Sequence, residues 1–249
     1  MNTASQNVCP VWVLNLERST ARRHFMEEQL QHQGIEFEFI QAIDGTNLSN
    51  SHLNAYSKQA AMQVCGRELS YEEIGCALSH ASMWHRIVTE RHAAVLVLED
   101  DVIIERDLFA LLQYRHAFPS DWEYINFLTE APKIPFGGPI YHEHRFCQFK
   151  WRADGTCAYL LNARGAQKLL RHTYPIRWPA DGITCRTYLT DVVSYGTVPQ
   201  VVRLSDFESD IGHDDNEPPY KRSRKILLAI FDAIRYFIHY QKNRKISLI

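Results

Sequence analysis

Apolar positions along the chain form short continuous runs and longer segments with helical spacing. The run from Val11 to Leu16 predicts a strand, and residues 20–33 predict a helix that Gly34 ends. Phe37 to Ile40 predicts a second strand. Because a strand, a helix and a parallel strand in this order are the usual opening of a Rossmann-like sheet, the pattern predicts an α/β fold.

The same pattern continues through most of the chain. The spacing predicts further helices over residues 72–91, 106–116 and 163–172, and further strands over residues 94–98, 124–127, 157–161 and 192–203. The proline- and glycine-rich segment from Thr129 to Tyr141 is expected to be a long loop, and such loops are often lids or binding loops. No internal repeat interrupts this order, so we expect one main sheet.

Composition narrows the class of protein. With 249 residues, of which 45% are hydrophobic and 22% charged, the chain can bury one large core or two small ones. A net charge of -2 and a pI of about 6.6 argue against a nucleic-acid-binding protein, whose domain would be basic. The six cysteines form no CxxC pair and no zinc-type spacing, which favours free thiols in a reducing compartment. The first ten residues show no secretion signal, so a cytoplasmic location is expected.

Three consecutive acids follow the apolar run at 95–98. Glu99, Asp100 and Asp101 come where an open α/β sheet binds its ligands, at the carboxyl end of a strand. Clustered carboxylates favour a hard cation such as Mg²⁺ or Mn²⁺, which in turn binds a diphosphate. Strand alternation places Glu99 and Asp101 on one side and Asp100 on the other. The alternative is an acidic surface turn.

Several blocks elsewhere in the chain accompany these acids in a fixed order. The blocks are Val13–Ser19 with Arg22-Arg23, Ala42–Gly45, Leu69–His80, Glu99–Asp101 and Gly155–Tyr159 with Gly165-Ala166. Together they resemble glycosyltransferase family 25, which comprises the lipooligosaccharide-type bacterial sugar transferases and their collagen-glycosylating relatives. The resemblance covers roughly residues 10–211. It implies a Rossmann-like GT-A domain at 8–216 that uses Mn²⁺ or Mg²⁺ to transfer a hexose, galactose or glucose, from a UDP-sugar to a lipooligosaccharide or LPS acceptor with inversion.

The resemblance also implies roles for the acids and for a late histidine. Asp101 would bind the metal, and Glu99 or Asp100 would contact the metal or the ribose. The chain departs from the family's usual pattern here, because Glu99 stands where an Asp is common. His213 would be an additional metal ligand, and its alternative is a solvated loop residue.

Four residues near the start match nucleotide-contacting blocks of the family. Asn15, Arg22, Ala42 and Asp44 would contact the donor, since Arg pairs with phosphate and an Asp after a strand accepts from ribose hydroxyls. Each also has a structural alternative. Asn15 would cap a turn, Arg22 would be a solvated helix residue, and the Asp44-Gly45 dipeptide would form a turn.

The helix at 72–91 carries three further candidates. Gly75, Ser79 and His80 match a family block that would approach the donor, although a lone His on an apolar helix is more often structural. Gly75 would cost the helix about 1 kcal/mol relative to Ala, which indicates close packing or a ligand nearby.

An inverting transfer needs a carboxylate that accepts the proton of the acceptor hydroxyl. Asp181, in the Pro179-Ala180-Asp181 sequence that matches a family element, is the first candidate, and Asp154 is the second. The structural alternative for Asp181 is the N-cap of a helix at 182–190.

Residues 219–249 form a separate basic tail. Eight Lys and Arg between Lys221 and Lys245 face one acid, Asp232, and flank the apolar run Ile226 to Ile238. That run is too short to span a bilayer, so the pattern favours a basic amphipathic helix on an anionic membrane, which implies a peripheral location on the cytoplasmic face of the inner membrane. The alternative is a helix packed on the core.

Two other functional classes fit parts of the sequence. A Mg²⁺-dependent phosphohydrolase or nucleotidyltransferase also places acids after a strand, but the chain has no Gly-rich phosphate loop. A non-catalytic nucleotide-sugar-binding relative would keep the fold without turnover, and the presence of both Asp101 and Asp181 argues against it.

Overall fold

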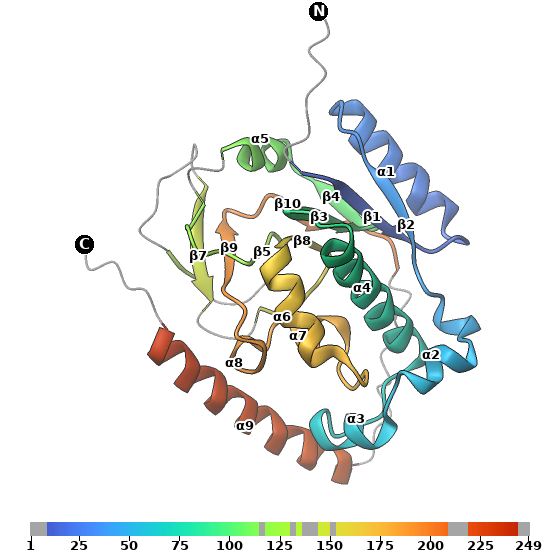
Figure 1. Cartoon of the computed structure of the whole chain (residues 1–249), viewed down its shortest axis with the longest axis vertical. Helices are drawn as coiled ribbons and strands as arrows, with labels where there is room; N and C mark the ends of the chain where they lie inside the picture. Colours follow the sequence, from blue (N-terminus) through green and yellow to red (C-terminus); the bar gives the residue numbers. More distant parts are fainter. Residues whose placement is uncertain are drawn as a thin grey trace, which may run out of the picture.

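The computed structural model describes residues 9–114, 118–129, 133–135, 144–149, 153–208 and 219–243. The strands are β1 (Val11–Asn15), β2 (Glu38–Gln41), β3 (Ala94–Glu99), β4 (Val102–Ile104), β5 (Tyr124–Asn126), β6 (Lys133–Pro135), β7 (Arg145–Phe149), β8 (Ala158–Asn162), β9 (Ser194–Val198) and β10 (Val202–Leu204). The helices are α1 (Thr20–His32), α2 (Asn50–Asn54), α3 (Lys58–Val64), α4 (Tyr71–Thr89), α5 (Asp107–Gln113), α6 (Ala163–Thr173), α7 (Ala180–Thr184), α8 (Thr187–Thr190) and α9 (Pro219–Asn243), with a 3-10 turn η1 (Gly45–Asn47). Figure 1 shows their arrangement.

The expected Rossmann-like opening is confirmed. β1 lies between β2 and β3 and is parallel to both, and α1 connects β1 to β2. Gly34 ends the connection after α1 with φ of 68°, a left-handed conformation that glycine adopts without a side-chain clash. The carboxyl ends of three parallel strands therefore lie at one edge of the sheet.

The rest of the sheet is mixed. The eight strands follow the order β2-β1-β3-β8-β5-β9-β7-β6, and β8 is antiparallel to both of its neighbours, β3 and β5. The expected strand at 192–203 is wrong in extent, because it divides into β9 and β10 around Pro199, and β10 pairs with β4 in a separate two-stranded sheet. The expected loop at 129–141 contains β6, and the rest of that loop lies largely outside the described residues.

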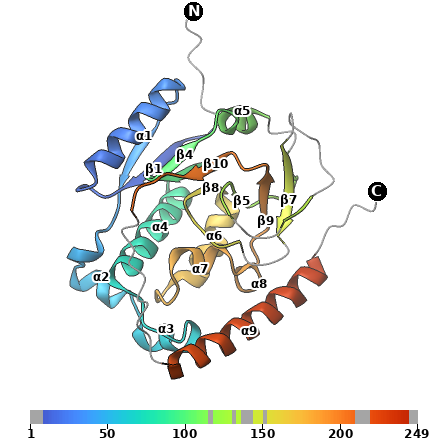
Figure 2. The same ribbon diagram turned by 180° about the vertical axis from the view of Figure 1, so that it is seen from behind.

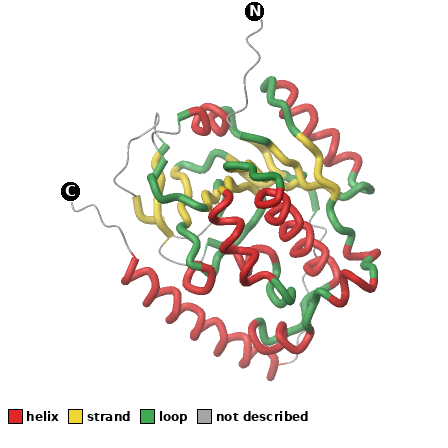
Figure 3. Tube along the Cα trace, in the orientation of Figure 1, coloured by secondary structure: helices red, strands yellow, loops and turns green. Residues whose placement is uncertain are grey.

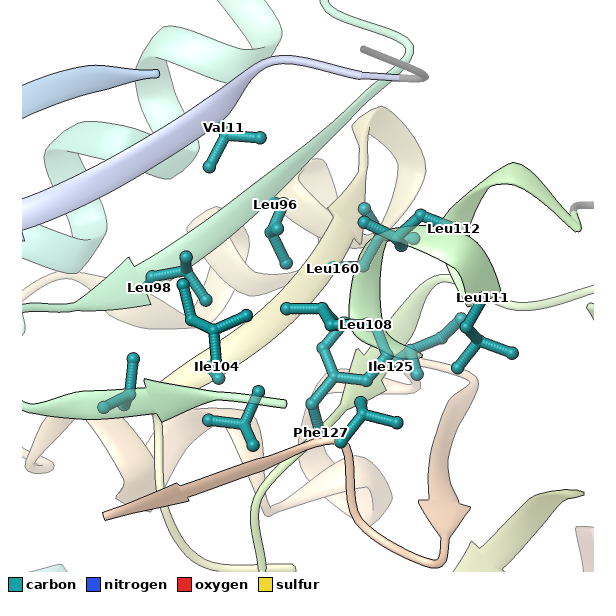
Figure 4. Packing of buried hydrophobic residues seen from close by; sticks show 14 of the residues in the cluster. Val11, Leu96, Leu98, Ile104, Leu108, Leu111, Leu112, Ile125, Phe127 and Leu160 are labelled. Atoms are coloured by element: carbon teal, nitrogen blue, oxygen red, sulfur yellow. The ribbon is translucent and has the colours of Figure 1, made fainter. Parts of the chain in front are cut away.

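Strand alternation divides the core into two layers. Val11, Val13, Leu96 and Leu98 point toward α1 and α5, and part of this cluster is shown in Figure 4. Their neighbours Trp12, Leu14, Val95 and Val97 point to the opposite face, where α4, α6 and α7 cover the sheet. Because β1 and β3 are buried on both faces, their apolar runs are continuous, as in other central parallel strands.

The C-terminal helix α9 runs along the outside of the molecule, beside α8 (Figures 2 and 3). Its outward side chains are apolar and about half exposed, namely Ile226, Leu227, Ile230, Phe231, Ile234, Phe237 and Ile238. Among the described residues, no helix is both long and apolar enough to cross a bilayer.

Candidate functional site

A pocket opens at the edge where the three parallel strands end. It has about 640 Å³ of empty space, counting the open solvent at its mouth. Its lining comes from the ends of β1, β2 and β3 and from the first half of α4: Leu14, Leu16, Arg18, Arg22, Ala42, Ile43, Gly45, Glu72, Cys76, Ser79, Glu99, Asp100 and Asp101. The sheet therefore brings together blocks that are up to 87 residues apart, from Leu14 to Asp101, with carboxylates and guanidinium groups around one opening.

Asp100 is held by neighbouring side chains of the same site. Asn15 donates from Nδ2 to Oδ2 of Asp100 at 2.6 Å, and Arg22 donates from Nη1 to Oδ1 at 3.0 Å. Asp100 is 5% exposed. Burial raises the pKa of its carboxyl above the ordinary value, and the hydrogen bonds from Asn15 and Arg22 oppose that rise. Asn15 and Arg22 thus fix Asp100 beside the pocket rather than reach freely into it.

Asp101 is the carboxylate with unused coordination capacity. Its Oδ1 is buried and has no hydrogen-bond partner among the described residues, and its Oδ2 lies 3.5 Å from Nη1 of Arg22. Burial and the negative charge of Glu99 raise the pKa of Asp101 to about 6, although Arg22 lowers it. A divalent cation would supply the missing partner and neutralise the repulsion between the two acids. Asp101 and Glu99 thus fit a hard metal ion at the pocket.

Glu99 is oriented by a buried chain of polar groups. His80 Nε2 lies 3.2 Å from Oε1 of Glu99, and His80 Nδ1 lies 2.9 Å from the hydroxyl of Tyr159. Tyr159 in turn accepts from Nε1 of Trp84 at 3.0 Å, and Thr156 donates its hydroxyl to Glu99 at 2.9 Å. Burial raises the pKa of Glu99, but the partners His80 and Thr156 lower it more, so the pKa lies below its usual value.

His80 therefore acts on the pocket through Glu99. Its side chain is fully buried and is absent from the pocket lining, which contains Glu99 and Ser79. Among the described residues, its two ring nitrogens contact only Tyr159 and Glu99. The structure places it behind Glu99 rather than at the surface of the pocket.

Gly75 and Ser79 hold the β2–α2 loop against α4. A Cβ on Gly75 would lie 2.5 Å from the carbonyl oxygen of Ile43, and one on Gly45 would lie 2.5 Å from the backbone of Glu72. Ser79 accepts from the backbone N–H of Ile43 at 2.8 Å and donates to the Gly75 carbonyl at 2.7 Å. These contacts explain the glycine in the helix as close packing that forms one wall of the pocket.

Two nucleotide candidates lie at the mouth of the pocket. Ala42 lines it and donates its backbone N–H to Asn15. Asp44 caps the 3-10 turn η1 by accepting from the Thr46 N–H and pairs with Arg18, a lining residue. Burial raises the pKa of the Asp44 carboxyl, but its contacts with Thr46 and Arg18 lower it further, to a value below the ordinary one. Asp44 thus shapes the rim as an ionised group.

The two candidate bases lie on different segments outside the pocket lining. Asp181 is in the first turn of α7, whose N-cap is Pro179, so the expected helix at 182–190 divides into α7 and α8. Its charge and those of Glu99 and Asp101 reach the Cys76 thiol, whose pKa is raised mainly by burial. Asp154 is exposed and precedes Gly155, at the end of the sheet where β8 begins. His213 lies outside the described residues.

Sequence reasoning missed two residues that act on Glu99. Thr156 donates to Glu99 directly, and Tyr159 acts on it through His80, because β8 is antiparallel to β3 and pairs Ala158 with Leu98. Both residues belong to the block Gly155–Tyr159, which the sequence analysis had noted. Its contact with the acids at 99–101 could not be predicted, because it depends on the pairing of β8 with β3. The sequence analysis also did not single out Cys76, which lines the pocket together with Glu99.

Comparison with known proteins identifies the family of this site. The family model "Glycosyltransferase family 25 (LPS biosynthesis protein)" matches residues 8–184. Procollagen galactosyltransferase 1 of Danio rerio is 32% identical over 174 residues, which is 65% of this chain and 28% of that protein. Procollagen galactosyltransferase 2 of Mus musculus is 34% identical over 123 residues, 46% of this chain and 20% of that one.

Other matches differ in what their names say. A Bos taurus protein named "Probable inactive glycosyltransferase 25 family member 3" is 30% identical over 175 residues, 67% of this chain and 29% of its own length. A solved glycosyltransferase involved in glycosylation of the major capsid of PBCV-1 has a TM-score of 0.35 at 9% identity and covers 68% of each chain. The chain spans less than a third of the length of these three curated relatives. On the family-model match, which covers more than half of its residues, the chain belongs to glycosyltransferase family 25.

Proposed function

We propose that this protein transfers a hexose, galactose before glucose, from a UDP-sugar to a saccharide acceptor with the help of Mn²⁺ or Mg²⁺. The single observation that carries the proposal is the unpartnered buried Oδ1 of Asp101, a residue that lines the pocket together with Glu99 at the carboxyl ends of three parallel strands. Galactose is favoured because several relatives are named galactosyltransferases.

In this proposal, different residues of the pocket bind the cation, the phosphates and the nucleoside of the donor. Asp101 and Glu99 would hold the cation, which neutralises the diphosphate as it leaves. Asp100 keeps Arg22 beside that cation site, and Arg18 at the mouth is positioned to pair with phosphate oxygens. The wall at Ala42 and Gly45 would receive the nucleoside, since both residues line the pocket.

We propose Asp181 as the catalytic base. Its carboxylate would accept the proton of the acceptor hydroxyl as the hydroxyl oxygen attacks the anomeric carbon. Asp181→Asn should then lower kcat by about 10²–10⁴-fold with donor affinity kept. A normal kcat in Asp181→Asn together with a low kcat in Asp154→Asn would mean that Asp154 is the catalytic base.

The acceptor is proposed to be an oligosaccharide of the lipooligosaccharide or LPS type, reached at the inner-membrane surface through α9. Two features support this attachment: seven exposed apolar side chains on one face of α9, and a helix sequence with six Lys or Arg and one acid, Asp232. That acid pairs inward with Arg186, which leaves the outward face without a described carboxylate.

Sedimentation with phosphatidylglycerol vesicles tests the attachment. The protein should bind at low salt, and Ile234→Glu should weaken binding because it places a charge on the inserted face. Leu53→Glu on α2 is the control, since Leu53 is an exposed leucine elsewhere. Equal binding by the wild type and Ile234→Glu would contradict a membrane role for this face.

A panel of nucleotide sugars tests the function itself. Release of UDP with a saccharide acceptor, dependent on Mn²⁺ or Mg²⁺ and greatest for UDP-galactose, is the expected result. The relative named as inactive favours one alternative, a binding protein that holds the nucleotide sugar without turnover. UDP-sugar binding without UDP release would support that alternative, and acceptor-independent phosphate release would indicate a phosphohydrolase.

A further inference from the structure

Three side chains of different chemistry converge behind the acids of the pocket. Cys76 and His80 are one helical turn apart on α4, and Glu99 ends β3 opposite them. One ligand atom from each, the Cys Sγ, a His ring nitrogen and a Glu carboxylate oxygen, lies within 4.8 Å of the others. Cys76 and Glu99 both line the pocket, so an ion in solvent can reach the cluster.

We propose that Cys76, His80 and Glu99 form a binding site for a thiophilic divalent cation, Zn²⁺ in the first instance, distinct from the hard-ion position at Asp101. Tetrahedral zinc with bonds of about 2.0 Å to nitrogen and 2.3 Å to sulfur keeps its ligand atoms about 3.3–3.6 Å apart. The 3.2 Å between His80 Nε2 and Glu99 Oε1 already matches this spacing. A small adjustment of the Cys76 side chain completes three ligands, and the pocket supplies the open fourth position.

The groups behind the cluster suit a ligating histidine. Nδ1 of His80 faces the Tyr159 hydroxyl at 2.9 Å, and metal-bound histidines usually use their second nitrogen in this way. When Nε2 binds the ion, the imidazole proton resides on Nδ1 and is donated to the Tyr159 oxygen. The Cys76 thiol releases its proton to solvent when its sulfur binds the ion, and Glu99 binds as a carboxylate.

The two cation positions share Glu99. A hard ion such as Mg²⁺ prefers the oxygens of Asp101 and Glu99, whereas zinc accepts the sulfur of Cys76 and the nitrogen of His80. Zinc at the cluster would therefore remove Glu99 from the hard-ion position. The site acts as an inhibitory one if the donor is bound through that position.

Cobalt provides a direct spectroscopic test on the full chain. Titration of the protein with Co²⁺ alone should produce a thiolate-to-cobalt charge-transfer band, which added Zn²⁺ removes. Cys76→Ser should abolish the band and weaken zinc binding at least about tenfold. Cys65→Ser should retain both, because Cys65 donates to the Arg177 carbonyl away from the pocket. No band in the wild type, or a band that persists in Cys76→Ser and vanishes in Cys157→Ser, would overturn the assignment.

X-ray absorption of the zinc-loaded wild type keeps the test independent of any variant. A sulfur scatterer in the zinc shell is expected, and a shell of nitrogen and oxygen alone would contradict the site. Inhibition of Mn²⁺-supported UDP release by Zn²⁺, relieved in Cys76→Ser, is the functional consequence. If the protein proves to have no transferase activity, the cobalt and zinc spectra still decide the metal site.

Discussion

At the level of single residues, Asp101 is partly buried, at a cost that its described neighbours do not offset. Its pKa is raised to about 6, chiefly by burial and then by the charge of Glu99. A carboxyl whose pKa is higher in the folded state than in the unfolded state stabilises the fold at low pH. That stability is fully present below the unfolded pKa of about 4 and is lost as the pH rises through about 6.

Asp101→Asn should therefore stabilise the metal-free protein above pH 6. We expect a gain of about 1–3 kcal/mol in the free energy of unfolding at pH 7, which disappears near pH 4. Denaturant melts at several pH values measure it. Asp206→Asn, at an exposed position, should show no such pH-dependent gain, and a neutral or lower stability of Asp101→Asn at pH 7 would contradict the assigned repulsion.

The same substitution should disable transfer while the fold survives. Loss of the charged oxygen at the cation position is expected to lower the turnover of UDP-galactose at least about 100-fold, the cost of removing a comparable charge-stabilising group. Asp206→Asn should be as active as the wild type. Metal-supported turnover at wild-type rates in Asp101→Asn would place the cation elsewhere.

Tyr159→Phe tests whether the Tyr159 hydroxyl positions Glu99 for the cation or only stabilises the fold. Loss of the hydroxyl leaves buried partners on His80 and Trp84 without a hydrogen bond, at a cost of about 1–3 kcal/mol. Tyr195→Phe removes a comparable hydroxyl that donates to Asp121 away from the pocket. Both should lower stability, but only Tyr159→Phe should raise the Mn²⁺ concentration needed for half-maximal turnover, by about tenfold. Equal metal dependence in the two variants would make the Tyr159 chain purely structural.

The sequence predicted part of this site for a clear reason. The acids at 99–101 follow a continuous apolar run, and a strand-end position is visible in such a pattern. Asn15 and Arg22 were expected to contact the nucleotide, yet their described partners include Asp100, since side-chain pairing across 78 or more residues leaves no trace in local spacing. Tyr159 was hidden for the same reason.

At the scale of elements, α9 is fastened to the body by polar contacts. Asp232 receives the Tyr188 hydroxyl and pairs with Nη2 of Arg186 at 3.1 Å, and Tyr236 donates to the Phe149 carbonyl at 3.0 Å. Arg186 stacks on the Trp178 ring next to α7. The helix is thus linked to the segment that carries Asp181.

Asp232→Asn should loosen this link strongly. The charge of buried Arg186 would lose its carboxylate partner, which typically costs about 3–5 kcal/mol, whereas Tyr236→Phe should cost about 1 kcal/mol. Chemical denaturation measures both, and hydrogen exchange should show greater exposure of α8 and α9 in Asp232→Asn. Equal, small losses in the two variants would mean that apolar contacts alone hold the helix.

Element boundaries were predictable where the apolar period was regular. β1, α1, α4 and β3 lie within two residues of their expected bounds, because each has a clear stop such as Gly34 or the end of an apolar run. The short elements α2, α3 and β4 were not expected, since runs of three to seven residues carry too little periodicity. The antiparallel direction of β8 depends on its partners in the sheet, not on its own sequence.

For the molecule as a whole, we expect that metal and nucleotide stabilise the fold together. Anything that binds only the folded protein adds stability by mass action, about 2.7 kcal/mol at a concentration 100 times the Kd. Mn²⁺ and UDP added together should therefore raise the melting temperature by more than the sum of their separate effects. Thermal melts of the full chain measure this, and simple additivity would mean that metal and nucleotide do not share a site.

We have proposed that Asp101 and Glu99 hold a cation that binds the diphosphate of a nucleotide sugar. Isothermal titration calorimetry of UDP into the full chain, with Mn²⁺ and then with EDTA, tests it without an acceptor. UDP should bind in the presence of Mn²⁺, and EDTA should weaken that binding at least about tenfold. Asp101→Asn with Mn²⁺ should bind UDP as weakly as the wild type does with EDTA. Equal UDP affinity in all three conditions would contradict it.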